Sequence, residues 1–331
     1  MHLVAQDASR RSLGLRCVLA ALALLTLSAC VTYPNITQSR SSCELQPGGW
    51  CTFISAAAKE AYPYAVAATN AYWDDDDVYA LPKNADGKED WLKPKKRLDI
   101  APEDARKGFD YQIFELTKPA DSGTTKLMVI AFRGTDPAFN DIWHGSIKKT
   151  QIDIALDYFA REKARFPSDT TWVATGHSLG GALATEVSLA NSDVTAWSFN
   201  LSPFYRGHAE ANQAKRNVVN ERGEVLEGFR KNKPASASNI FQINCRPQKK
   251  RFKKHSIRTV GDCLIWIAAY TDKGARKVIK ANKDTDHPIN KPEVECGPLD
   301  AEHPKLTGKP ISPCRHVAKR SKAELRAAKR D

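Results

Sequence analysis

One short segment, residues 173–181, restricts the fold of this chain more than any other, and it reads Val-Ala-Thr-Gly-His-Ser-Leu-Gly-Gly. Gly176 and Gly180 flank Ser178 in the spacing G-x-S-x-G, which is typical of a sharp turn between a strand and a helix. A Cβ at either glycine would collide with neighbouring elements, and the turn raises the serine oxygen above the sheet. The segment predicts an α/β protein with Ser178 as a candidate nucleophile and the amide of Leu179 as an oxyanion donor.

The residues on both sides of this turn support the interpretation. Residues 170–175 form a β-branched and apolar run, which predicts a buried strand. Apolar residues then recur at helical spacing, which predicts a helix directly after the serine. These residues are Leu179, Ala182, Leu183, Val187 and Ala190. A glycine-rich surface loop with an ordinary serine would need neither element.

The order of the elements around the turn extends the pattern. Residues 126–132 predict a strand that ends in Arg133-Gly134-Thr135, and a helical pattern follows over 152–159. A further strand is predicted over 194–199. Over roughly residues 109–207, this order resembles the class 3 (fungal-type) lipases of the α/β-hydrolase fold. Their usual F-G-x-P-R-V-G turn is replaced here by Phe-Asn-Leu-Ser-Pro-Phe-Tyr at 199–205.

The resemblance implies a mostly parallel central sheet flanked by helices and a serine hydrolase that cleaves carboxylic esters of lipids. It implies no cofactor. It also assigns a second oxyanion donor to Thr135. Apolar residues at helical spacing follow that position, and they fit a mobile lid over the site and a core-facing helix equally well. These residues are Phe139, Ile142, Trp143 and Ile147.

A serine nucleophile needs a histidine base, which in this fold follows the acid in the chain. The histidines after Ser178 are His208, His255, His287, His303 and His316. His208 is too close to the turn, and the cations around His255 would lower its pKa and make it a poor base. His287 and His303 each precede a proline and are expected in loops. His316 is therefore the predicted base, because the class 3 lipases place theirs shortly before a final helix, and His287 is the alternative.

The acid is predicted to be Asp262, at the end of a strand expected over 257–262. Asp286 and Asp300 are the competing candidates. Asp262 adjoins Cys263, and His316 lies two residues after Cys314, so disulfides at these points would hold both loops of the triad. His177 is expected to pack, because its ring would point to the other side of the turn from the serine.

The first 29 residues are expected to be a targeting segment. Arg10, Arg11 and Arg16 precede an apolar run from Cys17 to Ala29, and Leu27-Ser28-Ala29-Cys30 resembles a bacterial lipobox. Cleavage would then precede Cys30, whose lipid chains would anchor the protein to a membrane. The alternatives are an ordinary secretory signal and, from the arginine pair, a twin-arginine signal.

With this signal, the chain is predicted to be an exported lipoprotein of a bacterial envelope. Val31 after the cysteine favours the outer membrane by resemblance to enterobacterial sorting, with the protein facing the periplasm or the surface. Residues 30–45 would be a tether, and residues 46–331 a single hydrolase domain.

Six cysteines remain after Cys17 and Cys30, and an even number in an exported chain predicts disulfides. Fifteen pairings are open to six cysteines, and pairing of sequence neighbours is the simplest. These pairs are Cys43–Cys51, Cys245–Cys263 and Cys296–Cys314. The chain has no C-x-x-C, so a zinc site has no support.

The formal charge of +12 is concentrated in two runs. Residues 246–258 carry seven Lys or Arg and no acid, and residues 315–331 carry seven more. Such runs are most often solvated, and an anionic membrane is the alternative partner. Nucleic acid is not expected, since no recognition motif accompanies the charge. The acidic residues 74–77 lack the alternation and glycine turn of a calcium loop, so they predict a solvated loop.

The sequence therefore predicts a membrane-anchored serine hydrolase of lipid esters with Ser178, Asp262 and His316 as its triad. The head group and acyl chain of the substrate stay open. A thioesterase or amide hydrolase could use the same scaffold, and an inactive envelope lipoprotein that binds a partner is the alternative from another class. The oligomeric state stays open.

Overall fold

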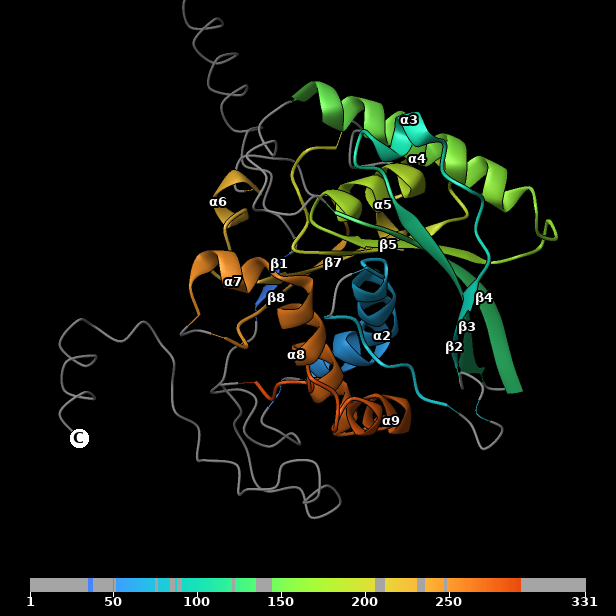
Figure 1. The fold of residues 1–331 in the computed structure, drawn as a ribbon. Coiled ribbons are helices and arrows are strands. Elements are labelled where there is room, and N and C mark those ends of the chain that lie inside the picture. Colours follow the sequence, from blue (N-terminus) through green and yellow to red (C-terminus); the bar gives the residue numbers. More distant parts are fainter. Residues whose placement is uncertain are drawn as a thin grey trace, which may run out of the picture. The chain divides into compact units, whose positions relative to one another are not determined.

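The central feature of the fold is an eight-stranded sheet with the order β1-β8-β7-β6-β5-β4-β3-β2 (Figure 1). The strands are β1 Asn35–Thr37, β2 Leu92–Lys95, β3 Tyr111–Ala120, β4 Gly123–Phe132, β5 Trp172–His177, β6 Thr195–Phe199, β7 Arg216–Glu221 and β8 Asn239–Ile243. Along the sheet, the six strands β1, β8, β7, β6, β5 and β4 are each parallel to their neighbours. Strand β3 pairs antiparallel with β4, and β2 pairs antiparallel with β3. Pro94 lies in β2, where a missing N–H is tolerated because the strand is at the edge of the sheet.

The computed structural model describes residues 35–37, 50, 52–74, 77–83, 87, 91–120, 123–134, 145–205, 212–230, 236–246 and 249–292. Its helices are α2 Thr52–Asn70, α3 Pro102–Ala105, α4 Gly145–Lys163, α5 Leu179–Ala190, α6 Glu227–Arg230, α7 Arg251–His255, α8 Ile257–Ala269 and α9 Lys273–Ala281, with the 3₁₀ turn η3 at Gln213–Lys215. None of these helices has the length and apolar character needed to cross a membrane.

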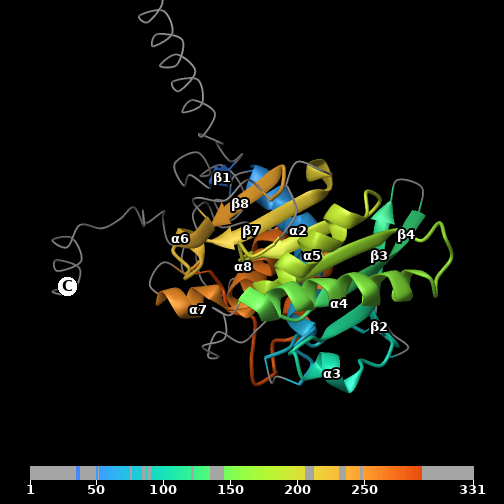
Figure 2. The same cartoon turned by 90° about the horizontal axis from the view of Figure 1, so that it is seen from above.

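Helices cover both faces of the sheet, as Figures 1 and 2 show from two directions. Helices α4 and α5 lie on one face, where Phe159 and Leu183 pack against Ile130 and Trp172 of the sheet. Helices α2 and α8 lie on the other face. The predicted α/β-hydrolase class is therefore confirmed, with the serine turn between two central elements, β5 and α5.

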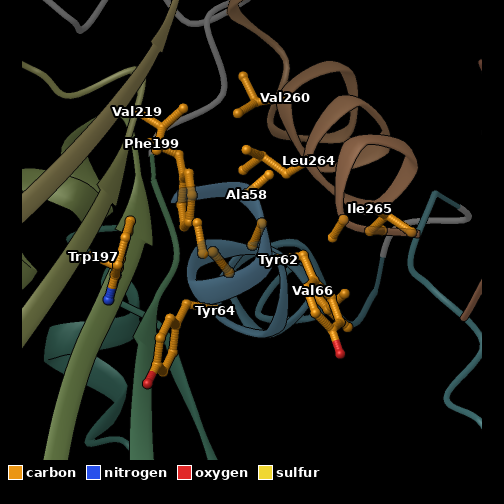
Figure 3. Packing of buried hydrophobic residues seen from close by; sticks show 14 of the residues in the cluster. Ala58, Tyr62, Tyr64, Val66, Trp197, Phe199, Val219, Val260, Leu264 and Ile265 are labelled. Atoms are coloured by element: carbon orange, nitrogen blue, oxygen red, sulfur yellow. The ribbon is translucent and has the colours of Figure 1, made fainter. Parts of the chain in front are cut away.

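The larger core lies between α2, α8 and the sheet (Figure 3). Tyr64 of α2 stacks on Trp197 of β6, with ring centroids 5.9 Å apart. Val260 and Leu264 of α8 are buried in the same cluster. Burying side chains of this size stabilises the fold by about 1.5–3 kcal/mol each, so this core fixes α2 and α8 against the strands that lead to the serine.

Most of the expected elements are present, and one is wrong. The predicted strands at 126–132, 170–175 and 194–199 correspond to β4, β5 and β6 within a few residues. Helix α2 continues through Pro63. Residues 257–262 form the start of α8 and not a strand. Their β-branched residues suggested a strand, but the apolar positions recur at helical spacing and pack against α2.

One disulfide lies in the described part of the chain and joins Cys245 to Cys263, with Cα atoms 6.0 Å apart. This confirms the predicted pairing of these two neighbours. The bridge connects the segment after β8 to α8 and encloses all of α7 in a loop of sequence separation 18. In the chain-entropy model, a disulfide that closes a loop of this length stabilises the folded protein by about 3 kcal/mol. Cys43, Cys51, Cys296 and Cys314 lie outside the described residues, as does Cys30.

Candidate active site

Ser178 occupies a strained turn between β5 and α5. Its φ of 54° and ψ of −119° lie outside the regions that L-residues favour, and the fold holds it there from both sides. A Cβ on Gly176 would collide with the backbone of Gly180, and a Cβ on Gly180 would collide with the carbonyl of Phe132. These collisions explain both glycines of the motif. Leu179 begins α5, so its amide is one of those that have no carbonyl partner within the helix.

A histidine and a carboxylate complete a line of hydrogen bonds from this serine. The Oγ of Ser178 lies 3.0 Å from Nε2 of His255. The opposite ring nitrogen of His255, Nδ1, lies 2.6 Å from Oε2 of Glu224. An ionised carboxylate only accepts, so Nδ1 carries the proton and Nε2 is free to accept from the serine hydroxyl. All three side chains are buried. The arrangement can remove a proton from Ser178 and stabilise the imidazolium that results.

The charge on Glu224 is maintained by its neighbours. Burial by itself would raise the pKa of this carboxyl, but the hydrogen bond to His255, the Arg230 guanidinium and the amide of Leu226 together hold the pKa below its ordinary value. The guanidinium of Arg230 pairs with the other carboxylate oxygen and also donates to the carbonyl of Leu201, 2.8 Å away. Glu224 therefore remains an anion beside the imidazole.

Asn200 fixes the backbone that carries His255. It follows β6 with a φ of 42°, a left-handed conformation that asparagine tolerates better than most residues. Its amide nitrogen donates to the carbonyls of Lys254 and His255 at 3.1 and 3.0 Å. Its side-chain oxygen accepts from the amide of Glu221 at 2.8 Å. Asn200 stands where the resemblance expects a glycine, and it ties β6, β7 and α7 together.

A second polar chain connects the candidate oxyanion segment to the same histidine. The amide of Gly134 lies 2.9 Å from the hydroxyl of Tyr72, which lies 3.3 Å from Nδ1 of His177. Nε2 of His177 is 2.5 Å from the carbonyl of His255. The two ends set the direction, because an amide donates and a carbonyl accepts. Tyr72 therefore donates to Nδ1 of His177, and Nε2 carries the proton. Burial, with the nearby His255, places the pKa of His177 well below its usual range, so this ring is neutral.

The structure places Asp262 in α8 and not at the end of a strand. Its carboxylate accepts from Arg258 and Tyr79, both at 2.9 Å, and from the backbone of Asn290, also at 2.9 Å. Burial raises the pKa of this carboxyl, although Arg258 opposes the shift. Asp262 thus joins α8 to two loops in a buried network, and the carboxylate beside the histidine of the site is Glu224. The structure therefore does not bring the predicted acid to Ser178 and His255, and the strand expected around Asp262 is wrong.

Of the other residues predicted for the site, some lie in the described part of the chain and others lie outside it. His287 is half exposed, and its ring lies 3.7 Å from Asp77. His316 and Thr135 lie outside the described residues, as do three of the four lid candidates, Phe139, Ile142 and Trp143. Ile147 is in the first turns of α4, where only the backbone is described. The histidine that the structure brings to Ser178 is His255, which the sequence had argued against.

His255 was set aside because of the cations around it in the sequence, and the structure shows where those cations lie. Lys254 is buried and extends away to donate to the carbonyl of Arg222 at 3.1 Å. Lys250, Arg251 and Lys253 are exposed to water, which screens their charge. The sequence did contain a signal for the observed site, because Ser178, Glu224 and His255 follow the chain order of α/β-hydrolases.

The acidic residues near position 75 are partly in ion pairs. Asp74 lies 2.5 Å from the Arg133 guanidinium, and Asp77 lies 3.9 Å from that of Arg258. Across the described ranges, no group of three or more His, Cys, Asp or Glu side chains is placed to hold a metal ion.

No protein-family model matches the sequence, and no curated protein matches it. Among solved structures, a deletion mutant of the Rhizomucor miehei lipase propeptide complex is 15% identical, with a TM-score of 0.37, covering 57% of this chain and 68% of that one. The lipase from Rhizopus microsporus var. chinensis is 16% identical, with a TM-score of 0.34, covering 52% and 68%. An alpha-beta serine hydrolase homologue from Coxiella burnetii is 12% identical, with a TM-score of 0.29, covering 59% and 100%.

A further buried acid supports the loop that carries Glu224. Glu221, at the end of β7, accepts from the amides of Cys245 and Arg246 at 3.2 and 3.0 Å. Burial raises the pKa of its carboxyl to about 7, although these hydrogen bonds oppose the shift. The folded protein therefore holds this proton over a pH range in which the unfolded chain has released it.

Replacement of Glu221 by Gln should remove a pH dependence of stability. Because the pKa is raised on folding, the contribution of Glu221 to the free energy of unfolding should fall as pH rises from about 4.5 to about 7, by up to about 3 kcal/mol. Glu221→Gln cannot ionise, and its single amide oxygen can still accept from one of the two backbone amides. Its stability should be lower overall and flatter across this range. Denaturant titrations at several pH values measure the difference. Glu103→Gln, at an exposed site on α3, is the control and should follow the wild type. Parallel curves for wild type and Glu221→Gln would contradict the prediction.

Proposed function

We propose that this protein is a serine hydrolase that cleaves carboxylic esters of lipids, with Ser178 as nucleophile, His255 as base and Glu224 as the acid that orients the base. The observation that carries the proposal is the buried line of hydrogen bonds from Glu224 through His255 to Ser178. It lies at a strained strand-to-helix turn, where a serine hydroxyl is held ready for attack.

The geometry supports the following mechanism. The hydroxyl of Ser178 attacks the ester carbonyl while Nε2 of His255 takes its proton, and the Glu224 carboxylate stabilises the imidazolium. The amide of Leu179 donates to the developing oxyanion, and the resemblance to the class 3 lipases assigns the second donor to Thr135. The imidazolium then protonates the departing alcohol, which leaves an acyl group on Ser178. Water, activated by His255, releases the acid and restores the serine.

The ester class is supported by the chemistry of the site together with the sequence motifs. A serine that is paired with a histidine and a carboxylate attacks acyl carbonyls. The resemblance of residues 109–207 to the class 3 lipases favours a lipid ester among such acyl compounds. The described site handles the reacting carbonyl and proton only. Selection among soluble esters, phospholipids and triacylglycerols would depend on the shape of the acyl pocket, and on residues 139–147 if they form a lid and not a core-facing helix.

The central test separates the two histidines. Ser178→Ala and His255→Ala should each lower kcat on p-nitrophenyl esters by roughly 10³-fold or more, because the members of a triad act as a unit. His316→Ala is the matched comparison and should keep most of the activity. A fluorophosphonate probe should label the wild type and the His316 variant, and should fail to label the Ser178 variant. Circular dichroism verifies that each variant is folded.

Two results would contradict the proposal in different ways. A folded Ser178→Ala protein with the wild-type rate would exclude the serine mechanism altogether. Loss of activity in His316→Ala, with activity kept in His255→Ala, would retain the serine and return the role of the base to His316. Glu224→Gln against Asp262→Asn makes the same comparison for the acid, since both carboxylates are buried and only Glu224 contacts His255.

Tyr72 should act as a positioning residue, because its hydroxyl joins the segment before Thr135 to His177 and so to the backbone of His255. Tyr72→Phe removes this link and keeps the ring. We expect a loss of roughly 10-fold to 100-fold in kcat with KM little changed, since a displacement of about 1 Å in an active site costs on this order. Tyr79→Phe removes a buried hydroxyl that bonds Asp262 instead, and should alter stability more than kcat. Equal falls in kcat for the two variants would argue against positioning by Tyr72.

We propose in addition that the protein is anchored to a bacterial outer membrane through Cys30. The support is the sequence Leu27-Ser28-Ala29-Cys30 after an apolar run. Mass spectrometry of the mature protein should find an N-terminal cysteine that carries acyl chains, and Cys30→Ser should leave the protein unprocessed or released from membranes. An unmodified mature N-terminus at another position would refute the anchor without affecting the triad.

A further inference from the structure

Helix α7 brings the candidate base and an exposed surface together within five residues. Its last two residues, Lys254 and His255, are buried, whereas Arg251, Phe252 and Lys253 are exposed. Phe252 is 63% exposed, more than any other large apolar side chain in the described ranges. It precedes His255 by three residues, and residues at this spacing are neighbours on a helix surface. An exposed aromatic residue therefore lies within one helical turn of the candidate base.

This ring is surrounded in the sequence by positive charge. Lys249, Lys250, Arg251 and Lys253 flank it, and no acidic residue occurs between positions 246 and 258. None of these four cations forms an ion pair with a carboxylate of the described residues, in contrast to the paired Arg230 and Arg258. We call the surface formed by residues 249–253 the α7 face.

We propose that the α7 face binds an anionic lipid surface and thereby places the triad on it. The cations match the charge of lipid phosphates, and each one near such a surface strengthens binding roughly fivefold within a Debye length of about 8 Å. An exposed phenylalanine among cations gains by entering the boundary between head groups and acyl chains. A soluble polyanion would match the charges but offer no apolar layer for the ring.

The connection to the site is short and rigid. His255 is held through its own carbonyl by Asn200 and His177, and the Cys245–Cys263 bridge closes the loop that contains α7. Contact of the α7 face with a lipid layer would therefore set Ser178 close to esters in that layer without a rearrangement of the triad. The substrate would then be an ester in an anionic lipid interface, and this part rests on the proposed function.

Binding is tested first without catalysis. The Ser178→Ala protein, which cannot hydrolyse the vesicles, is sedimented with phosphatidylcholine vesicles that contain or lack phosphatidylglycerol. We expect tighter binding to the anionic vesicles, weakened by salt. Replacing Lys250, Arg251 and Lys253 by Gln should weaken this binding by roughly 100-fold, as expected for three charges at about fivefold each. Phe252→Ala should weaken it further by a factor that salt does not change.

Matched controls remove the same features elsewhere. Lys273, Lys280 and Lys283 are exposed in and beside α9, and their replacement by Gln removes the same charge from another surface. Phe53→Ala removes an exposed ring from α2. Both controls should keep vesicle binding within about twofold of the Ser178→Ala protein. Equal losses from the α7 and α9 triple variants would overturn the proposal, since binding would then follow total charge.

Further outcomes distinguish a failure of lipid binding by the α7 face from a failure of the proposed hydrolase function. Heparin binding as tight as binding to anionic vesicles, with no effect of Phe252→Ala on either, would identify a polyanion surface and overturn the lipid assignment. With Ser178 intact, the α7 triple variant should hydrolyse soluble p-nitrophenyl esters at the wild-type rate. Absence of that activity in the wild type refutes the proposed function and leaves the vesicle result standing. If the triple variant does not fold, the proposal is tested by vesicle binding of Phe252→Ala and by the effect of salt on binding of the Ser178→Ala protein.

Discussion

The strained backbone at Ser178 is the constraint on which the rest of the site depends. A serine with a φ of 54° is kept in place only because β5, α5 and β4 pack closely around it, and two glycines make this contact sterically feasible. The buried cores on both faces of the sheet supply the stabilisation that offsets the strain. The hydroxyl is thereby fixed in one direction, and the imidazole must be brought to it.

The imidazole of His255 is placed beside Ser178 by helix α7, whose position is fixed by several contacts. Asn200 and His177 bind the carbonyl of His255, Glu224 binds its ring, and a disulfide closes the loop around α7. These contacts come from β6, β5 and the loop after β7, which are neighbours in the parallel sheet. Parallel strands end at the same edge, so residues distant in sequence converge there without long connections. The site is thus a product of the sheet order as much as of its side chains.

The same segment joins the chemistry to the outside of the molecule. Lys254 and His255 turn inward while the residues before them face water. In the sequence, these residues belong to the basic run 246–258, and such a run most often forms a solvated surface. Only the structure separates the two roles, because α7 leaves Arg251, Phe252 and Lys253 exposed where it approaches the sheet with Lys254 and His255 buried. The inward positions carry and hold the proposed base, and the outward positions form the surface for which we propose lipid binding.

The sequence by itself predicted the nucleophile turn and the succession of the central strands along the chain, and it offered Cys245–Cys263 among the simplest of fifteen possible pairings. Each of these is encoded locally, by glycine sterics, by apolar periodicity or by proximity in the chain. The residues opposite Ser178 were decided only by the tertiary structure. Asp262 was predicted as the acid because it follows a glycine and β-branched residues, yet helical packing against α2 buries it beside Arg258. His255 was set aside for its charged neighbours, because a linear sequence does not show which lysines face water or which carboxylate faces the ring. Long-range contacts fix those two facts, and they exist only once the sheet has formed.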